Sequence, residues 1–536
     1  PHCWRTDKPV LYYPMESWFI KVSELTERMF NLNKKINWKP ISTGEGRFGN
    51  WLKSANDWNL SRSRFWGVPL PIWVNEENSE YKIVGSVEEL VNEINISIKK
   101  GYMKSNPFAN FEVGNMSEDN YNNIDLHKDI VDEIILSSKN GLPMKREKDI
   151  IDVWFESGSM PYAQIHYPFE NKNLIDQKTN FPADFIAEGV DQTRGWFYTL
   201  HAISSLVFNS ISYKNVLSNG LVLDKNGQKM SKRLGNAVDP FDMIDKYSAD
   251  AVRWYMISNS NPWDNLKFDE DGVAEVNRKF FGTLENIYSF FSLYANIDGF
   301  EYKEDHIDVK KRPELDRWII SELNSLIKQV DSDLGNYDLT PATRSINDFV
   351  QEKLSNWYVR LSRRRFWKGQ YNDDKISAYQ TLYECLITIS KLISPIAPFY
   401  SEHIFQSLNM VSKREDFNSV HLSNFPDSIP QLIDSKLENK INQIRNICSL
   451  ALSIRKKEKI KVRQPLNKII IPVKNNDERN EIENAKSQIL SEINVKSIEF
   501  LDNKDSLLVK ELKPNFKLLG PRYGKVIYAV AHEIKK

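Results

Sequence analysis

The stretch Ala183-Asp-Phe-Ile-Ala-Glu-Gly-Val-Asp-Gln-Thr-Arg-Gly-Trp-Phe197 decides the fold of this chain. Its first five residues predict a short strand that ends at Glu188-Gly189. A helix is predicted behind it, because apolar side chains recur at helical spacing from Trp196 to Val207. The next strand is predicted over residues 215–223. A strand, a helix and a strand in close succession indicate a βαβ unit with a parallel sheet.

A second motif, Lys229-Met230-Ser231-Lys232-Arg233, follows the predicted strand after an Asn226-Gly227 turn. In parallel sheets ligands bind beyond the carboxyl ends of the strands, so this loop and Glu188-Gly189 should open on one crevice. Two ammonium groups on a mobile loop can reach a triphosphate and neutralise charge during nucleotidyl transfer. A solvated lysine-rich turn is the alternative interpretation of this motif by itself.

The bulk composition restricts the class of protein. The chain has 536 residues with 41% hydrophobic and 27% charged side chains, which is typical of a globular protein of about three or four domains. Its 72 basic and 72 acidic residues cancel, so a nucleic-acid surface must come from local clusters. Three distant cysteines exclude a disulfide framework and fit a reducing, cytoplasmic setting. No apolar run or N-terminal pattern predicts a membrane span or a signal peptide.

Five segments are expected along the chain. Aromatic residues 1–75 and residues 151–270 form the main domain, and the more polar residues 76–150 are an insertion on it, with a strand predicted at 151–155. Residues 271–425 contain long amphipathic helices, at 314–334, 341–365, 376–392 and 398–408, which indicate a bundle. Residues 426–536 are a small α+β tail with a helix at 434–454, a strand at 468–473 and a charged helix at 477–493.

Three segments taken together resemble the class I aminoacyl-tRNA synthetases, and among them the eukaryotic-like branch of the isoleucyl enzymes. The segments are Asp152-Val-Trp-Phe-Glu-Ser-Gly158, Glu188 to Phe197, and Lys229 to Arg233. The second one distinguishes the isoleucyl from the valyl and leucyl enzymes. The resemblance covers essentially the whole chain. It implies an α/β fold, the second half of a Rossmann-type nucleotide-binding domain, followed by an all-α anticodon-binding bundle and the α+β tail.

The resemblance implies a reaction in two steps. Isoleucine and ATP, with Mg²⁺, give isoleucyl-adenylate and pyrophosphate, and the acyl group then passes to tRNA(Ile). Lys229 and Lys232 would be catalytic, because their charges can neutralise the phosphates as pyrophosphate leaves. By the same resemblance, the residues that bind ATP and the adenylate would be Glu188, Gly189, Asp191, Gln192, Met230 and Ser231.

Trp154 and Trp196, together with Gln192, are expected to line the pocket for the branched aliphatic side chain, because indole rings give rigid apolar area. The alternative is that both tryptophans belong to the ordinary core. Glu188 and Asp191 could likewise be a helix cap and a surface carboxylate.

The tRNA-binding surface is expected in the helical region. Trp357-Tyr-Val-Arg-Leu-Ser-Arg-Arg-Arg-Phe-Trp-Lys368 interleaves aromatics with three arginines on one helical face. Arginine pairs with phosphates and stacks on bases, although a basic solvated face is the alternative. The expected tRNA-binding residues are Trp357, Arg360, Arg363 and Arg364, then Lys461 and Arg463 of a second basic stretch, and Arg62 and Arg64 towards the acceptor end.

The chain also departs from the family. The His-x-Gly-His element and the editing domain do not occur in these residues, so we expect the 536 residues alone to be a poor catalyst. Thr6 stands where a Cys-x-x-Cys motif that begins at Cys3 would have its second cysteine, and a second cysteine pair does not occur further along the chain. Neither zinc nor any other resident metal is therefore expected. A monomer is expected. Two alternatives stay open, a noncatalytic tRNA-binding or regulatory protein and a valyl-type enzyme.

Overall fold

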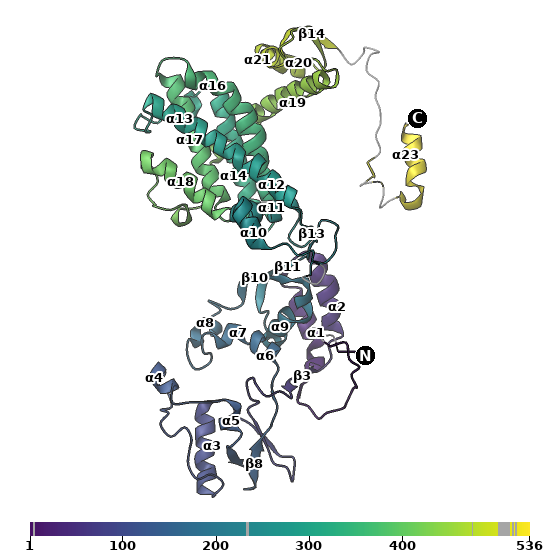
Figure 1. Cartoon of the computed structure of the whole chain (residues 1–536), viewed down its shortest axis with the longest axis vertical. Helices are drawn as coiled ribbons and strands as arrows, with labels where there is room; N and C mark the ends of the chain where they lie inside the picture. Colours follow the sequence, from purple (N-terminus) through teal and green to yellow (C-terminus); the bar gives the residue numbers. More distant parts are fainter. Residues whose placement is uncertain are drawn as a thin grey trace. The chain divides into compact units, whose positions relative to one another are not determined.

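The computed structural model describes residues 1–3, 6–231, 235–473, 475–501, 515–516, 519 and 523–535. They form two compact units (Figure 1). The first contains Pro1–Ala274 with Asp333–Pro341, and the second contains Glu275–Ser332 with Ala342–Lys536. The expected division into five segments stays a prediction.

The first unit is built on a parallel three-stranded sheet in the order β10 (Ala183–Gly189), β11 (Tyr213–Asn219) and β2 (Asn37–Lys39). Helix α9 (Trp196–Val207) connects β10 to β11. Because β10 and β11 are parallel, the predicted strand, helix and βαβ unit are confirmed.

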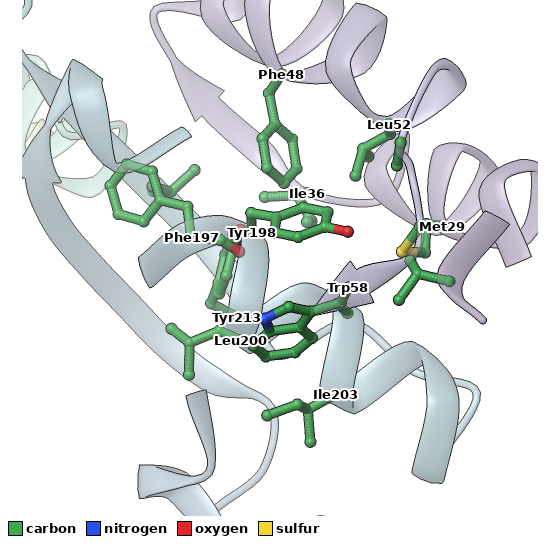
Figure 2. Packing of buried hydrophobic residues seen from close by; sticks show 14 of the residues in the cluster. Met29, Ile36, Phe48, Leu52, Trp58, Phe197, Tyr198, Leu200, Ile203 and Tyr213 are labelled. Carbon is green, nitrogen blue, oxygen red and sulfur yellow. Dashed lines mark hydrogen bonds between the residues drawn. The ribbon is translucent and has the colours of Figure 1, made fainter. Parts of the chain in front are cut away.

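The core of this unit lies against α9 (Figure 2). Phe197 and Leu200 of α9 pack with Trp38 of β2 and Tyr213 of β11, and the Tyr213 hydroxyl donates to the Phe197 carbonyl at 3.0 Å. Figure 2 shows Phe48 of η2 (Thr43–Phe48) and Leu52 of α2 (Gly49–Lys53) entering the same cluster. Aromatic rings therefore fix the helix on the sheet.

The strand predicted at 151–155 is wrong. The structure has a two-residue strand, β9 (Ile150–Ile151), followed by helix α6 (Val153–Gly158). The buried carboxylate of Asp152 accepts from the Trp154 amide at 3.4 Å, so this residue is the helix N-cap. Trp154 therefore lies on a helix.

The strand predicted over 215–223 is interrupted. Residue Gly220 separates β11 from β12 (Val222–Leu223), which pairs with β13 (Leu266–Lys267). A Cβ at Gly220 would lie only 2.4 Å from the Asp264 carbonyl oxygen, so the main chains approach closely there. The chain changes partners at this glycine.

The insertion expected at 76–150 has its own core. Its antiparallel sheet runs β6 (Tyr81–Ile83), β5 (Ile72–Val74), β8 (Pro143–Arg146), β7 (Ile135–Ser137), and α3 (Val87–Lys99) packs beside it. Trp73 is 2% exposed and donates to the Ile134 carbonyl at 2.8 Å. This small α+β body therefore begins a few residues before the predicted boundary.

The second unit contains a bundle of helices α13 (Gly282–Asp298), α14 (Glu314–Gly335), α17 (Asp373–Ile393) and α18 (Pro398–Ser412). The helix predicted at 341–365 is continuous but not uniform. It runs as α15 (Leu339–Asp348), a π-helical segment η7 (Phe349–Val359) and α16 (Arg360–Trp367). Inside the bundle, Arg365 forms a bidentate pair with the fully buried Asp316, at 2.6 and 2.8 Å.

The tail contains α19 (Ser435–Lys457) and two parallel strands, β14 (Leu466–Pro472) and β15 (Val495–Leu501). The single charged helix predicted at 477–493 is two helices, α20 (Asn476–Asn484) and α21 (Lys486–Ile493), which meet at Ala485. The buried Ala485 breaks the run because its ψ of 5° is not helical.

The remaining elements connect those already named. In the first unit they are β1 (Phe19–Ile20), η1 (Val22–Leu25), α1 (Thr26–Asn33), η2 (Thr43–Phe48), α2 (Gly49–Lys53), β3 (Trp58–Asn59), β4 (Ser61–Arg62), α4 (Glu118–Tyr121), α5 (Lys128–Val131), α7 (Met160–Ala163), α8 (Lys172–Asp176), η3 (Val190–Arg194), α10 (Pro240–Tyr247) and α11 (Ala249–Asn259). Later come α12 (Glu270–Val276), η5 (Asn277–Phe281), η6 (Val309–Lys311), η8 (Val420–Leu422), η9 (Pro430–Leu432), η10 (Gly524–Val526) and α23 (Ile527–Lys535).

The segment Asp333–Pro341 belongs to the first unit although it begins in the last residues of helix α14. Its Tyr337 ring stacks on Phe185 of β10 with 4.7 Å between centroids. The Thr340 hydroxyl donates to the Ile257 carbonyl at 2.7 Å. An aromatic stack and a hydrogen bond therefore hold this short segment on the first unit.

Candidate active site

The acidic motif, residues 188–197, and the chain that leads to the lysine motif leave the three-stranded sheet from one edge. Gly189, the last residue of β10, is the register partner of Asn219, the last residue of β11. The carboxyl ends of these parallel strands therefore meet, with Glu188 opposite Ser218. The lysine motif begins ten residues after Asn219, beyond β12, which pairs with β13 outside the three-stranded sheet. This edge is where an open α/β sheet binds its ligands.

Residues 223–229 form a hairpin that leads into the lysine motif. Leu223 and Lys229 make an antiparallel bridge, and the buried Asp224 accepts the Asn226 and Gln228 amides at 2.9 and 2.8 Å. Hydrogen bonds, the largest from the Asn236 side chain, hold the pKa of Asp224 below its ordinary value of 3.8. Lys229 is exposed. Lys232, the other predicted catalytic lysine, and Arg233 lie outside the described residues.

The acidic motif is tied into a compact turn. Gln192 accepts from the Trp196 amide at 3.0 Å and donates to Asp191 at 3.2 Å, so it caps the start of α9. The Asp191 carboxylate folds back over Gly189, where a Cβ would lie 2.7 Å from it. Glu188 and Asp191 are both exposed. Gly195 is the N-cap residue of α9, and the side chain that bonds the first amide of this helix is that of Gln192 rather than Glu188 or Asp191.

Two arginines that the sequence interpretation missed brace this turn. Arg47 donates to the hydroxyl of the buried Thr193 at 2.9 Å. The Arg194 guanidinium lies over the Trp51 ring, 4.8 Å from its centroid. Arg47 and Thr193 are far apart in the sequence, so no local pattern could have revealed the contact.

The structure brings Trp154 and Trp196 together. The Trp196 indole donates to the Ser157 carbonyl of α6 at 3.2 Å. A Cβ at Gly195 would lie 3.1 Å from the Trp154 ring, which therefore covers the start of α9. Trp154 is 40% exposed, which speaks against a core role for it, whereas Trp196 is half-buried against the core.

The buried Asp152 also anchors the segment before the insertion. Its carboxylate accepts from the Trp58 indole at 3.0 Å and pairs with Arg62 at 2.9 Å. A cavity of about 740 Å³ lies beside it, lined in part by Arg62, Arg64 and Trp66. Trp66 is 77% exposed and stacks on a histidine ring. Arg62 is therefore partly engaged within the protein, whereas Arg64 is exposed.

The arginine helix of the second unit is not uniform. Trp357 is only 4% exposed, so its ring is covered by the protein, and its contact with tRNA stays a prediction. Arg360 lies over Trp357 and pairs with Glu492 at 2.5 Å. Arg363 and Arg364 are exposed, and among the described residues no carboxylate pairs with them.

The second basic stretch is a turn held from inside. The buried Arg455 donates to the carbonyl oxygens of Lys461, Gln464 and Asn494 at 2.9 to 3.3 Å. These bonds fold the turn so that Lys461 and Arg463 stay exposed. Contact of these two residues with RNA stays a prediction.

Two kinds of feature do not occur in the described residues. No three His, Cys, Asp or Glu side chains among them converge as metal ligands do. No helix in the same part of the chain is long and apolar enough to cross a membrane. The expectations about zinc, location and oligomeric state stay predictions.

Two family models match the chain. The model for "tRNA synthetases class I (I, L, M and V)" matches residues 7–269, and the model for "Anticodon-binding domain of tRNA ligase" matches residues 316–470. The chain belongs to the class I aminoacyl-tRNA synthetases. The catalytic model covers both motifs of the sheet edge, and the anticodon model covers Arg363 and Arg364.

Curated relatives of this synthetase chain are similar along its whole length. Isoleucine–tRNA ligases of Bacteroides fragilis, strain ATCC 25285, and Bacteroides thetaiotaomicron are 61% and 59% identical over 99% of the chain. That of Porphyromonas gingivalis is 58% identical over the full chain. The chain spans just under half the length of these relatives, 46 to 47%. The predicted eukaryotic-like branch is not tested by these similarities.

A solved structure supports the fold of this synthetase chain. Mycobacterium tuberculosis methionyl-tRNA synthetase, in complex with methionyl-adenylate, has a TM-score of 0.53 over 80% of this chain and 70% of its own. Their sequences are 15% identical, so the likeness concerns the fold alone.

Proposed function

We propose that this chain is the part of an isoleucine–tRNA ligase that carries the lysine-loop half of the active site and the anticodon-binding domain. The observation that carries the proposal is the register of Gly189 with Asn219, which places the start of the acidic motif beside the start of the chain that leads to the lysine loop. The 61% identity to an isoleucine–tRNA ligase supports the choice of amino acid.

In the first step the enzyme joins isoleucine to ATP. A carboxylate oxygen of isoleucine attacks the α-phosphorus, the bond to the bridging oxygen breaks, and pyrophosphate leaves with the electron pair. Lys229 and Lys232 neutralise the charge that develops on the phosphates, and Met230 and Ser231 carry them on the loop. Mg²⁺ enters with ATP as part of the substrate.

The adenylate lies along the acidic motif. Glu188 accepts from its hydroxyl or amino groups, and Gly189 lets the main chain approach it. Asp191 and Gln192 orient the substrate ammonium, since their side chains are already held together at 3.2 Å. Trp154 and Trp196 give the isoleucine side chain two rigid apolar walls.

The tRNA is bound by exposed cations. Arg363 and Arg364 contact the anticodon stem-loop, supported by the absence of carboxylate partners in the described part of the chain. Lys461 and Arg463 make further phosphate contacts. Arg64, with Arg62 behind it, meets the acceptor end beside the exposed Trp66.

The test uses the complete enzyme that contains these residues. Replacing Lys229 by Gln should lower the kcat of isoleucine-dependent ATP–pyrophosphate exchange roughly 100-fold, the scale of losing one electrostatic stabiliser of a transition state. Lys225→Gln is the matched control. Lys225 is an exposed lysine of the same hairpin, four residues earlier, and its loss should leave the exchange unchanged.

The outcomes separate the open alternatives. Faster exchange with valine than with isoleucine would identify a valyl-type enzyme. No exchange with any amino acid, together with intact tRNA binding, would identify a noncatalytic tRNA-binding protein. Equal loss in the Lys229 and Lys225 variants would remove the assigned role of Lys229.

A further inference from the structure

The side chain of Asn236 ties together three parts of the lysine loop. Its amide nitrogen Nδ2 donates to Asp224 Oδ2 at 3.0 Å and to the Lys229 carbonyl at 3.3 Å. Its oxygen Oδ1 accepts from the Ser231 amide at 2.9 Å. One carboxamide therefore holds the main chain on both sides of Met230.

Asp224 gives this carboxamide a fixed base. It is 8% exposed and uses Oδ1 to accept the Asn226 and Gln228 amides. Its other oxygen, Oδ2, receives Asn236. Because Asp224 immediately follows β12, the hydrogen bonds connect the loop to a strand of the first unit.

These hydrogen bonds matter because a lysine side chain does not by itself hold its ammonium group in one place. Its ammonium sits on a flexible stem of four carbons, so its location depends on where the main chain places Cα. The bridge to Leu223 fixes only one side of Lys229. Without Asn236, the amide of Ser231 and the carbonyl of Lys229 would exchange these bonds for bonds to water, and the loop would sample more conformations.

We propose that Asn236 is a positioning residue that latches residues 229–231 onto Asp224, so that the Lys229 ammonium is held where pyrophosphate leaves. This inference rests on the proposed function of the loop. Asn236 does not touch the substrate. It acts through the main chain, and losing it raises the cost of arranging the loop in the transition state.

The first test measures the latch itself, without any activity. Hydrogen exchange of the complete protein, followed by mass spectrometry, should show the Ser231 amide exchanging roughly fivefold faster in Asn236→Ala, the change expected from the loss of one hydrogen bond. The matched control is Asn261→Ala. Asn261 donates to the Asp264 carboxylate at 3.0 Å, and within the described residues its side chain has no hydrogen bond to the loop. Unchanged exchange at Ser231 in Asn236→Ala would overturn the proposal.

The second test measures catalysis. In isoleucine-dependent ATP–pyrophosphate exchange, Asn236→Ala should lose roughly tenfold in kcat with an unchanged KM for isoleucine, because the loop acts on the leaving phosphates. Asn261→Ala should keep both parameters. If the thermal midpoint of unfolding falls together with kcat in Asn236→Ala, the residue has a folding role and the proposal is overturned.

Exchanging the amide and the carboxylate between positions 236 and 224 tests whether a hydrogen bond, rather than the size of the side chain, holds the loop. Asn236→Asp places a carboxylate against Asp224 and should be at least as slow as Asn236→Ala. Adding Asp224→Asn restores a donor across the 3.0 Å contact, and this double variant should recover part of the lost kcat. No recovery would overturn the latch. Wild-type protein without exchange activity would instead refute the proposed function, while the Ser231 amide would still report the latch.

Discussion

The imidazole of His201 is the clearest buried titratable group of the first unit. It is fully buried in α9 and donates from Nε2 to the Met29 carbonyl at 2.8 Å. Within the described residues Nδ1 has no hydrogen-bond partner. Burial lowers the pKa of His201 from 6.5 to about 4, against the smaller effect of the Met29 bond. The ring is therefore neutral in the folded protein near neutral pH.

This pKa predicts a pH dependence of stability. The unfolded chain takes up a proton below pH 6.5, while the folded chain does so only near 4. Stability is thus full above about 6.5, falls as the pH falls, and has lost about 2 kcal/mol at pH 5. Urea unfolding at pH 7.5 and 5, read from the tryptophans of this unit, checks the value.

His201→Gln is the comparison for that measurement. Its amide can still donate to Met29 but cannot take up the proton, so the variant should lose about 2 kcal/mol less between the two pH values. An identical pH dependence in both proteins would show that other groups cause it.

At the scale of elements, the contact between α6 and α9 depends on Gly158. A Cβ there would lie 2.9 Å from the Thr199 main-chain carbon and 2.9 Å from Ile203 Cδ1. Since main chain cannot move aside easily, Gly158→Ala should destabilise the first unit by about 1 to 3 kcal/mol. Thermal unfolding measures this, and the KM for isoleucine should rise because α6 carries Trp154.

Gly46→Ala is the matched control. Gly46 lies in the helical segment η2, and a Cβ there would meet nothing within 4 Å. The substitution should be neutral or stabilising by up to about 1 kcal/mol, because alanine loses less backbone entropy in a helix. Equal destabilisation at Gly46 and Gly158 would mean that close approach of α9 is not the cause.

At the scale of the whole molecule, the proposed binding of tRNA depends on exposed charge. The double variant Arg363→Ala, Arg364→Ala should bind tRNA(Ile) roughly tenfold more weakly, and the dependence of log affinity on log salt should lessen by roughly 1 to 2. Filter binding over a series of salt concentrations measures both quantities. ATP–pyrophosphate exchange, which needs no tRNA, should not change.

Arg360 provides the contrast within the same helix. It is already paired with Glu492 at 2.5 Å, so Arg360→Ala should change the salt dependence less than either exposed arginine does. A larger effect at Arg360 than at Arg363 and Arg364 would place the RNA on the other side of the helix.

The periodicity of apolar residues predicted the elements of the parallel sheet. The strand at Ala183, helix α9 and their parallel arrangement followed from apolar spacing and short connections. Trp154 was placed on a strand because a short apolar run fits both structures. Only the capping carboxylate of Asp152 decides for the helix. The resemblance, rather than the periodicity, supplied the roles of the acidic motif and the lysine loop.

Other features depend on contacts that spacing does not contain. Trp357 was expected to bind tRNA because it lies in the arginine-rich stretch. Its burial follows from the packing of the π-helical segment η7, which its position in the sequence does not reveal. Asn236 was missed because its partner Asp224 is reached only after the loop folds back.

The segment Asp333–Pro341 limits how recombination can exchange the two units between genes. Its Tyr337 completes an aromatic stack on Phe185 of the catalytic sheet, yet the residues on either side of it in the sequence belong to the helical unit. Recombination that replaced the helical unit as one uninterrupted block would exchange this segment as well, and the stack would survive only where the donor gene also encoded an aromatic residue there. Shuffling between lineages should therefore retain nucleotide-binding and helical portions as co-adapted pairs.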